Sequence, residues 1–384
     1  MDNPFKKIIS NISNIGFFSS NTNDSAVGID IGSSSIKVVE IKRKAGKAVL
    51  STYGMIGLGP YAGIDIGRVT NLPVEKIIEA LTETLKQSGI TTNFGALAMP
   101  VQSSLIFTIE LPPNVKKSEI SSIITIEARR FIPIPITEVS LDWFLLPKKE
   151  ATFLEANSEN VSAPSEEKTE VLVVAIQNDA IAKYRSIINR CKLNANFFEI
   201  EVFSSIRSNF EHELSSVLLI DFGASRTKLS IVEFGTVKSF HIVSRGGADI
   251  TDSISKSLSI SFPEAEKMKK EYGLYGNSNE KKLADVIKIH TDYIFSETNN
   301  VLLGYEKKYN RTISKVILTG GGALLKGLKE VALNNFKAEV EVGRPFSKVG
   351  TPAFLDKILE STGPEFAVAI GLALRKLQNN EIMK

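Results

Sequence analysis

Short apolar runs alternate with helical patterns along most of the chain. Runs bounded by glycine or polar residues predict buried strands, and apolar residues spaced three and four positions apart predict amphipathic helices between them. This alternation is typical of α/β folds, in which helices cover the faces of a largely parallel sheet. The predicted strands cover residues 26–31, 36–41, 95–99, 139–146, 171–176 and 316–319, with a hairpin over 217–234, and the predicted helices cover 73–88, 179–191, 323–334 and 365–377, with a helix-rich stretch over 249–310.

Two stretches depart from this alternation. Residues 103–176 combine a short helix, which Ser118 is expected to cap, with a proline-rich turn at 131–135 and a polar segment at 148–170 that predicts a solvated loop. We interpret 103–176 as an inserted subdomain. Residues 1–26 carry a helical apolar stripe with two lysines beside it. This segment either docks on the rest of the protein, lacks a fixed structure or binds weakly to a membrane surface.

An internal repeat links the two halves of the chain. Residues 27–37 and 218–228 align without gaps at a separation of 191 positions. Each copy predicts a buried strand, a tight turn and a second strand, so the duplication predicts two similar lobes that present their turns to a shared cleft. The alignment pairs Asp30 with Asp221, Gly32 with Gly223, Ser34 with Ser225, and Lys37 with Lys228.

The chemistry of the two turns suits a nucleotide phosphate tail. Glycine allows the backbone N–H groups to approach an anion closely, serine hydroxyls add donors, and Lys37 adds a compact positive charge. Asp30 and Asp221 are suited to hold Mg²⁺ through its water molecules, because Mg²⁺ takes few direct carboxylate ligands. Either turn taken alone favours an ordinary β-hairpin, whereas two matching turns together with a third glycine loop favour a phosphate site.

Two further features extend this hypothesis. Gly320, Gly321 and Gly322 lie between a predicted strand and a predicted helix, where the helix N-terminus would favour an anion and the missing side chains would admit a flat ligand. The alternative is a plain strand-to-helix turn. Glu266 and Lys269 share one face of a helix that begins with a capping box at Ser261. They form either a weak surface ion pair or hydrogen-bonding partners for a ribose or base.

Composition narrows the class of protein. The 384 residues are enough for two lobes, and a net charge of +3 gives no electrostatic argument for nucleic-acid binding. The single cysteine, Cys191, excludes a disulfide framework and any site with several cysteine ligands. The sequence has neither an apolar run of membrane-spanning length nor a signal peptide. We therefore expect a reduced, soluble, intracellular protein.

The order of these motifs resembles the ATPase superfamily of actin, the heat-shock chaperones and the sugar kinases, over about residues 27–377. The resemblance implies an α/β, two-lobed actin-like fold made of duplicated ribonuclease-H-like domains, with ATP and Mg²⁺ as cofactors. It also implies Glu201 as the candidate catalytic residue that orients water. The implied nucleotide-binding residues are Asp30, Gly32, Ser33, Ser34, Ser35 and Lys37 in the first turn, Asp221, Gly223, Ala224, Ser225 and Thr227 in the second, and Gly246, Gly247, Glu266, Lys269, Gly320, Gly321 and Gly322, with Asp30 and Asp221 for the metal.

Within this superfamily the chain is most similar to the PilM family of type IV pilus assembly proteins, on the motifs at 27–40, 131–142 and 244–251. That resemblance implies an inserted subdomain placed as in the division protein FtsA. It further implies a groove beside that subdomain for the cytoplasmic tail of PilN, an inner-membrane protein. The protein would then be cytoplasmic and peripheral to the inner membrane through this partner, with other pilus proteins or self-association as further contacts.

The resemblance also assigns boundaries to the parts of the chain. Lobe 1 would comprise 27–102, 177–214 and 364–384, and the inserted subdomain 103–176. Lobe 2 would comprise 215–248 and 311–363, with 249–310 as its smaller subdomain, and 1–26 would form a separate N-terminal segment.

Departures from the family pattern leave alternatives open. Ala224, Ser225 and Arg226 stand where the second turn often has further glycines, which predicts nucleotide binding without fast hydrolysis. A cell-division protein like FtsA usually adds an amphipathic membrane helix, and this sequence stops at Lys384 soon after its last predicted helix. A small-molecule kinase is the third possibility, but the single cysteine excludes the zinc-containing branch of that class. Whether the machine is a type IV pilus or a related secretion or competence system stays open.

Overall fold

The computed structural model describes residues 24–112, 115–116, 118–146, 169–195, 197–211, 215–275 and 281–378. The predictions for the N-terminal segment and the polar loop at 148–170 therefore lie almost wholly outside the described residues.

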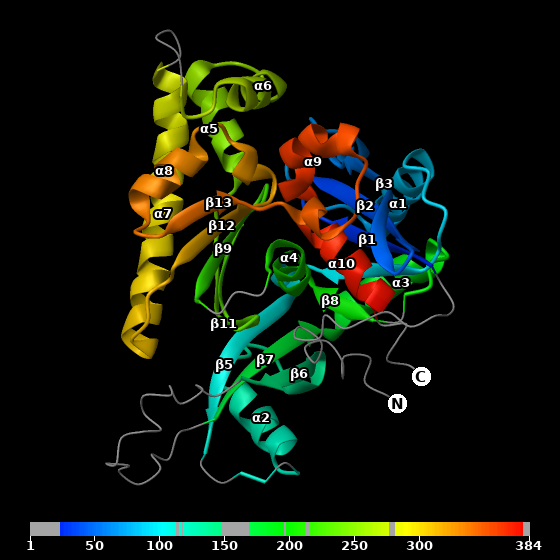
Figure 1. Cartoon of the computed structure of the whole chain (residues 1–384), viewed down its shortest axis with the longest axis vertical. Helices are drawn as coiled ribbons and strands as arrows, with labels where there is room; N and C mark the ends of the chain where they lie inside the picture. The colour runs from blue at the N-terminus through cyan, green and yellow to red at the C-terminus, as the bar shows by residue number, and fades with distance from the viewer. Residues whose placement is uncertain are drawn as a thin grey trace.

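Two five-stranded sheets with the same topology form the body of the protein (Figure 1). In each sheet the first strand pairs antiparallel with the second and parallel with the fourth. Even the register irregularity in the second strand recurs at the repeat spacing, at Glu40/Ile41 and at Ile231/Val232. The first sheet, in the order β3-β2-β1-β4-β8, contains β1 (Ser25–Ile31), β2 (Ser35–Lys44), β3 (Lys47–Gly57), β4 (Gly95–Met99) and β8 (Phe198–Ile200), and the second, in the order β11-β10-β9-β12-β13, contains β9 (Val217–Phe222), β10 (Thr227–Glu233), β11 (Thr236–Val243), β12 (Lys315–Thr319) and β13 (Glu339–Val342).

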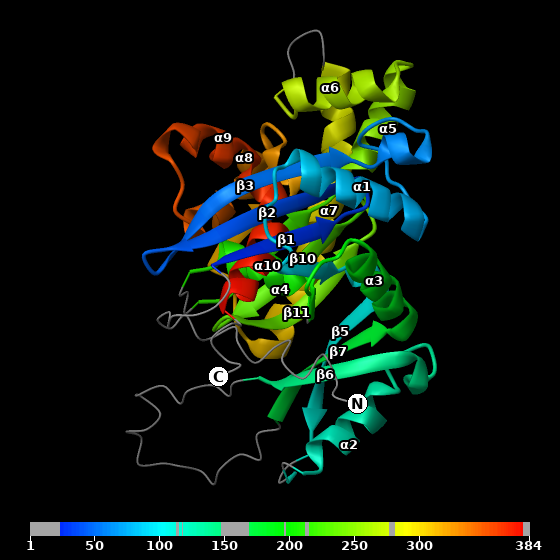
Figure 2. The ribbon, with the colours of Figure 1, turned by 90° about the vertical axis from the view of Figure 1, so that its right-hand side faces the viewer.

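Helices cover both faces of the first sheet and define lobe 1 (Figure 2). The helices α1 (Val74–Gln87) and α3 (Asn178–Arg190) share one core with Val27 and Ile29 of β1, whereas Ala26 packs with α10 (Ala367–Gln378) on the other face. A Cβ atom at Gly28 would lie 1.8 Å from the carbonyl oxygen of Ala369, so α10 rests directly on the strand backbone. This two-sided burial explains why β1 is a continuous apolar run.

Lobe 2 is built on the second sheet and carries a helical extension. The long helix α7 (Lys281–Tyr309) runs along the outer side of this lobe in Figure 1. Lobe 2 also contains α5 (Gly247–Leu258), α6 (Phe262–Tyr272) and α8 (Leu328–Asn335), whereas Leu359 of α9 (Asp356–Thr362) packs in the core that β1 and α10 form in lobe 1.

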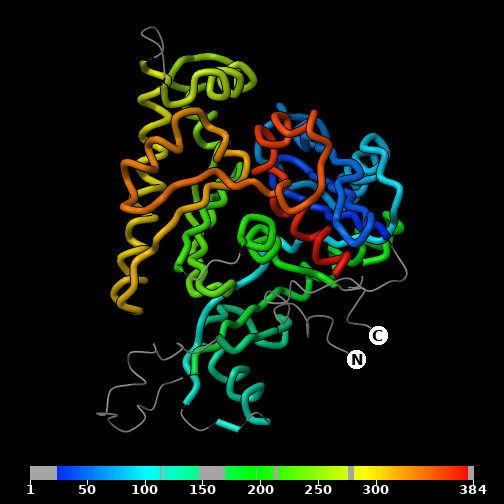
Figure 3. Tube along the Cα trace, in the orientation of Figure 1, coloured from blue at the N-terminus to red at the C-terminus, as the bar shows by residue number. Residues whose placement is uncertain are grey.

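A small three-stranded sheet projects away from both lobes and defines the inserted subdomain (Figure 1). Its strands lie antiparallel in the order β5-β7-β6, and α2 (Ile120–Ala128) packs on one face through Ile120 and Ile124. The strands are β5 (Ser104–Leu111), β6 (Val139–Leu145) and β7 (Thr169–Gln177). The chain enters this subdomain from lobe 1, returns through α3, passes into lobe 2 and comes back through α10, as Figure 3 shows.

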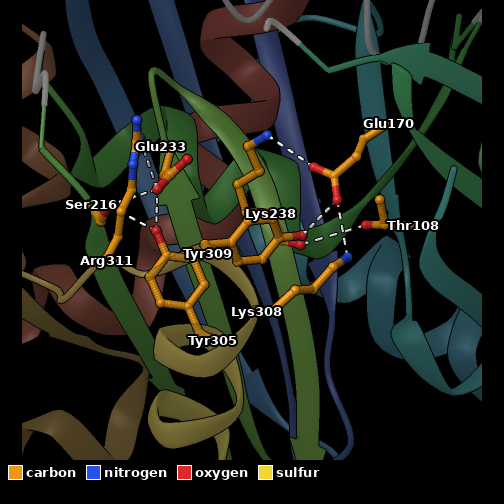
Figure 4. Close-up of polar contacts among 9 residues, drawn as sticks. All are labelled: Thr108, Glu170, Ser216, Glu233, Lys238, Tyr305, Lys308, Tyr309 and Arg311. Atoms are coloured by element: carbon orange, nitrogen blue, oxygen red, sulfur yellow. Dashed lines mark hydrogen bonds and ion pairs between the residues drawn. The ribbon is translucent and has the colours of Figure 1, made fainter. Parts of the chain in front are cut away.

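The inserted subdomain also contacts lobe 2, through the Glu170 side chain of β7 (Figure 4). The Glu170 carboxylate accepts hydrogen bonds from Lys238 of β11 at 3.3 Å, from Lys308 at 3.0 Å and from the Tyr309 hydroxyl at 3.0 Å. Burial alone would raise the pKa of the Glu170 carboxyl, but the two lysines hold it below its usual value. Thr108 of β5 donates a further hydrogen bond to the Lys238 carbonyl oxygen at 3.5 Å.

The structure corrects three local predictions. The helix predicted at 323–334 is a short 3-10 turn (Gly321–Leu324) followed by α8, which begins at Leu328 after Gly327 adopts a φ of +82°. Ser118 is not the cap of α2, because that helix begins at Ile120 after Glu119 without a side-chain capping bond. The strands β3, β5, β8, β11 and β13 were not predicted; β3 and β5 are largely half-exposed and lack a clean alternation, and β8 and β13 span only three and four residues.

No helix in the described part of the chain is both long enough and apolar enough to cross a membrane.

Candidate functional site

A cleft of about 960 Å³ lies between the two lobes, and the two repeated turns face each other across it. This volume is at the upper end of the range for small-molecule sites. Thr227 and Gly246 are the two predicted site residues that do not line it. The predicted residues that do line it are Asp30, Gly32, Ser33, Ser34, Ser35, Lys37, Glu201, Asp221, Gly223, Ala224, Ser225, Gly247, Glu266, Lys269, Gly320, Gly321 and Gly322.

The two turns have equivalent backbone geometry. The Gly32 amide donates to the Ser35 carbonyl oxygen at 3.0 Å, and the Gly223 amide donates to the Arg226 carbonyl oxygen at 3.0 Å. A Cβ atom at either glycine would lie within 3.0 Å of that carbonyl oxygen, so a larger residue would open the turn. The repeat therefore places two tight glycine turns at the carboxyl ends of β1 and β9, where a bound phosphate group can approach the backbone.

Each turn is flanked by a cross-strand aspartate–lysine pair. Asp30 is the register partner of Lys37, and their charged atoms are 3.7 Å apart. Asp221 is the register partner of Lys228, and the Lys228 ammonium donates to its Oδ2 at 2.8 Å. Burial raises the pKa of the Asp30 carboxyl, because the nearby lysines do not fully compensate the loss of hydration. A bound cation would stabilise this buried carboxylate.

Glu201 occupies the floor of the cleft as the first residue of α4 (Glu201–Asn209). Its Oε1 accepts the Val101 amide at 3.0 Å, and its Oε2 accepts the Lys228 ammonium at 2.5 Å. Burial alone would lower the pKa of Lys228, but Asp221 and Glu201 raise it above its usual value. The sequence alignment placed Lys228 opposite Lys37 but did not show that it bridges two carboxylates, because Glu201 belongs to a helix outside the repeat.

The third glycine segment packs directly against the second turn. Gly320 has a φ of +79°, and a Cβ atom there would lie 2.4 Å from the Asp221 Oδ1. At Gly322 a Cβ atom would lie 2.1 Å from the Phe222 ring. The expected helix N-terminus is absent from this described segment, since α8 begins five residues further on, so the macrodipole argument for this loop is wrong. Close backbone approach is the physical reason for these glycines.

Glu266 and Lys269 lie together at the lobe 2 side of the cleft. Lys269 forms an ion pair with Glu266 at 2.6 Å and donates to the Gly247 carbonyl oxygen at 3.0 Å. Thr251 also donates to the Glu266 carboxylate, at 2.5 Å. Burial alone would raise the pKa of the Glu266 carboxyl, but Lys269 and Thr251 hold it below its usual value. The pair is therefore a fixed, charged wall of the cleft.

Thr227 and Gly246 act behind the cleft wall. Thr227 is fully buried and donates to the Arg245 carbonyl oxygen at 2.9 Å. A Cβ atom at Gly246 would lie 2.4 Å from the Ala224 carbonyl oxygen, so this glycine allows the start of α5 to sit on the second turn. Both residues hold the second turn in place and do not face the cavity.

A contact across the mouth of the cleft was not expected from the sequence. The Arg68 guanidinium of lobe 1 lies 4.1 Å from the centre of the Phe262 ring in lobe 2 and 3.8 Å from the Asp252 carboxylate. Thr70 anchors the same segment to the first turn through its hydroxyl, which donates to the Ser33 carbonyl oxygen at 3.0 Å. No motif marks this contact, because the lobe 2 partners of Arg68 are more than 180 positions away in the sequence.

The residues of the cleft fit a nucleotide with a magnesium ion. The turns are closed so tightly that only glycine fits, because a Cβ atom would collide with a carbonyl oxygen of the same turn. Serine hydroxyls and Lys37 supply donors for phosphate oxygens. In the described part of the chain no group of three or more His, Cys, Asp or Glu side chains is arranged to hold a metal by itself. A magnesium ion here would thus rely on phosphate oxygens together with Asp30, as Mg²⁺ commonly does.

Comparisons with known proteins identify the family and the fold of the chain. The family model described as Type IV pilus assembly protein PilM matches residues 28–377. Cell division protein FtsA of Staphylococcus epidermidis is 24% identical over 398 residues, covering 93% of this chain and 80% of FtsA. The solved PilM-PilN type IV pilus biogenesis complex superposes with a TM-score of 0.75 at 24% identity, covering 92% of this chain and 98% of that one.

A more distant neighbour, the ethanolamine utilization protein EutJ from Carboxydothermus hydrogenoformans, superposes with a TM-score of 0.52 at 15% identity, covering 93% of this chain and 92% of that one. These likenesses confirm the predicted two-lobed actin-like fold. Because the family model spans nearly the whole described body, the chain belongs to the PilM family of type IV pilus assembly proteins.

Proposed function

We propose that this protein is an ATP-binding scaffold of the type IV pilus assembly machinery. The observation that carries the proposal is the convergence of the two Asp-x-Gly turns and the triple-glycine segment on one cleft. Packing explains Gly320 and Gly322, but it does not explain why segments far apart in the sequence present serine and charged groups to the same cavity. Nucleotide phosphates account for this combination.

Within this proposal each part of the cleft has a role. The two turns bind the phosphate groups, Lys37 offsets their charge, and Asp30 meets the magnesium ion. Gly320, Gly321 and Gly322 leave a flat surface for the nucleoside, with the Glu266–Lys269 pair on the opposite side as hydrogen-bonding partners for the ribose or base. Magnesium supplies charge neutralisation for the phosphates when it is bound.

The partner we propose is the cytoplasmic N-terminal tail of a PilN-like inner-membrane protein. Family membership supports this partner, and a solved PilM in the same family has been captured in a complex with PilN. The tail would bind in a groove beside the inserted subdomain, and the protein would be held at the cytoplasmic face of the inner membrane through it. An extended tail suits this location, because edge strands and grooves bind peptides through main-chain hydrogen bonds.

The Glu170 contact offers a route by which nucleotide binding affects the partner. Glu170 ties the inserted subdomain to β11 and α7 of lobe 2, while β5 and α3 connect the same subdomain covalently to lobe 1 (Figure 4). A nucleotide that draws the lobes together therefore acts on the inserted subdomain from both sides. ATP then alters partner affinity only to the extent that it binds the partner-competent state more tightly.

The proposal is tested first by titrating ATP with Mg²⁺ into the wild type and into Asp30→Asn. We expect the variant to lose about tenfold or more in affinity, because a close carboxylate–cation contact is worth at least 1.5 kcal/mol. Asp285→Asn, on the exposed side of α7, is the matched control and should bind like the wild type. Undiminished affinity in Asp30→Asn would contradict the site assignment.

The partner is tested with an immobilised peptide that carries the cytoplasmic tail of a PilN-like protein. Wild-type protein should be captured more strongly with Mg-ATP than without it. Equal failure to bind under both conditions would argue against the partner while leaving the nucleotide site intact.

A further inference from the structure

Lys228 is a buried ammonium group in the wall of the proposed nucleotide cleft. Its side chain is 11% exposed, and its Nζ lies 2.5 Å from Glu201 Oε2 and 2.8 Å from Asp221 Oδ2. Both distances are those of charge-assisted hydrogen bonds. A lysine buried this deeply is stable only because two carboxylates flank it.

The equivalent lysine of the first lobe has a different environment. Lys37 approaches Asp30 at 3.7 Å, beyond hydrogen-bonding distance, and this is its one ion pair among the described residues. The internal repeat therefore supplies two lysines at the same position of the hairpin. One stands beside its aspartate at the cleft, and the other is locked between two carboxylates.

The Lys228 ammonium binds one oxygen of each carboxylate, that of Asp221 in lobe 2 and that of Glu201 at the start of α4 in lobe 1. Asp221 presents Oδ2 to Lys228, and its Oδ1 lies against the backbone of Gly320. Glu201 presents Oε2 to Lys228 and Oε1 to the Val101 amide. A magnesium ion that used either carboxylate would have to share it with a positive charge less than 3 Å away, and a carboxylate paired with an ammonium is a poor proton acceptor. Asp30 has no such competitor at hydrogen-bonding distance among the described residues.

We propose that Lys228 acts as a built-in cation that holds Asp221 and Glu201, so that these two carboxylates neither recruit magnesium nor act as a free general base when nucleotide binds. Lys228 is thus a positioning residue of the cleft, and this inference rests on the proposed nucleotide site. It deepens that function in one respect: the bound nucleotide is retained, and the two lobes stay clamped for as long as it is bound. The expected base, Glu201, is then a partner of Lys228 instead of an acceptor for the proton of attacking water.

The test compares ATP and ADP affinity by calorimetry with excess Mg²⁺ and with EDTA. In the wild type we expect EDTA to lower the affinity by about tenfold, because only Asp30 then contributes a carboxylate to the bound Mg²⁺. In Lys228→Met, which keeps the length of the apolar stem and removes the charge, the released carboxylates should increase this dependence on Mg²⁺ by a further factor of about ten or more. Lys228→Arg is the control that keeps the charge and should resemble the wild type.

A second variant keeps the test decisive in case Lys228→Met does not fold. The double variant Lys228→Met with Glu201→Gln removes one of the two carboxylates that would otherwise be left unpaired, and it should show a smaller dependence on Mg²⁺ than the single variant. If both variants show the same Mg²⁺ dependence as the wild type, the proposed role of Lys228 is overturned although the nucleotide site stands. If the folded wild type binds neither nucleotide under either condition, the proposed function fails and this inference with it.

Discussion

Glu199 lies in the short buried strand β8, where its side chain is completely shielded from water. Arg207 of α4 donates to both of its carboxylate oxygens at 2.7 Å, and Ser204 and Arg375 donate further hydrogen bonds. Burial alone would raise the pKa of the Glu199 carboxyl, but Arg207 and Arg375 lower it to about 2. Because Arg375 belongs to α10, this one carboxylate connects the two segments that join the lobes.

The pKa of Glu199 predicts a specific dependence of stability on pH. Its pKa falls from 4.5 in the unfolded chain to about 2 in the folded protein, so its contribution is complete above pH 4.5 and is lost as the pH falls towards 2. Glu199→Gln should therefore be less stable than the wild type by about 3–5 kcal/mol at pH 7, since it breaks a buried ion pair. The difference should shrink as the pH is lowered below 4.5.

Urea unfolding at pH 7, 5 and 3.5 measures this difference directly. Glu360→Gln is the control, because that carboxylate is 62% exposed and lies 3.9 Å from Arg344 in a solvated pair. Parallel pH profiles for Glu199→Gln and the wild type would refute the assigned pKa.

The helices α4 and α10 cross with their backbones in close contact. A Cβ atom at Gly371 of α10 would lie 1.9 Å from the Ser204 carbonyl oxygen of α4. Neither backbone can move without also moving the sheet beneath it, because α10 rests on β1 at Gly28. Glycine is thus required at this position by the distance between two backbones and not by its conformational freedom.

Gly371→Ala should lower the free energy of unfolding by about 3 kcal/mol or more, at the upper end of the cost of overpacking a core. Gly304→Ala is the matched control, since Gly304 lies in the interior of α7 with no neighbour within 4 Å of the added Cβ atom. That control should raise the free energy of unfolding by about 0.5–1 kcal/mol, because alanine favours a helix over glycine. Thermal unfolding of the two variants should therefore shift in opposite directions, and a neutral Gly371→Ala would contradict the close crossing.

At the scale of the whole molecule, Glu170 determines whether the inserted subdomain responds to lobe 2. Its ion pairs with Lys238 and Lys308 join a strand of one unit to a strand and a helix of the other (Figure 4). They are the charged contacts that hold the inserted subdomain against lobe 2, beside the hydrogen bond from Thr108 to the Lys238 carbonyl oxygen. The contact is therefore the element through which the proposed coupling can be broken without touching either binding site.

Hydrogen exchange with and without Mg-ATP tests this coupling. In the wild type we expect ATP to slow exchange in β5, β6 and β7. In Glu170→Gln the amides of β11 and β7 should exchange faster, and the ATP effect on the inserted subdomain should be lost while ATP still protects the cleft. Glu127→Gln, which breaks an exposed pair with Arg130 in the same subdomain, should behave like the wild type. An unchanged ATP response in Glu170→Gln would show that coupling runs elsewhere.

Much of the fold could be predicted from the sequence, because the internal repeat and the continuous apolar runs of buried strands are visible without knowledge of tertiary contacts. The gapless repeat at a separation of 191 positions predicted two equivalent lobes. Asp30 and the turn at Gly32 in lobe 1 have structural counterparts in Asp221 and the turn at Gly223 in lobe 2. Strands buried on both faces, such as β1 and β9, appear as continuous apolar runs. Half-exposed strands such as β3 carry no such signature, since their contacts depend on neighbours distant in the chain.

The sequence by itself therefore determined the actin-like architecture and, apart from Thr227 and Gly246, the predicted site residues that line the cleft. The tertiary structure alone decided how these residues pair: Lys228 with two carboxylates, Arg68 with Phe262, Glu170 with Lys238 and Lys308. The physical reason is that burial and hydrogen-bond geometry depend on which segments the fold brings together. Residue types and spacing specify what a site contains, whereas only the packed chain specifies which of its charges are already satisfied.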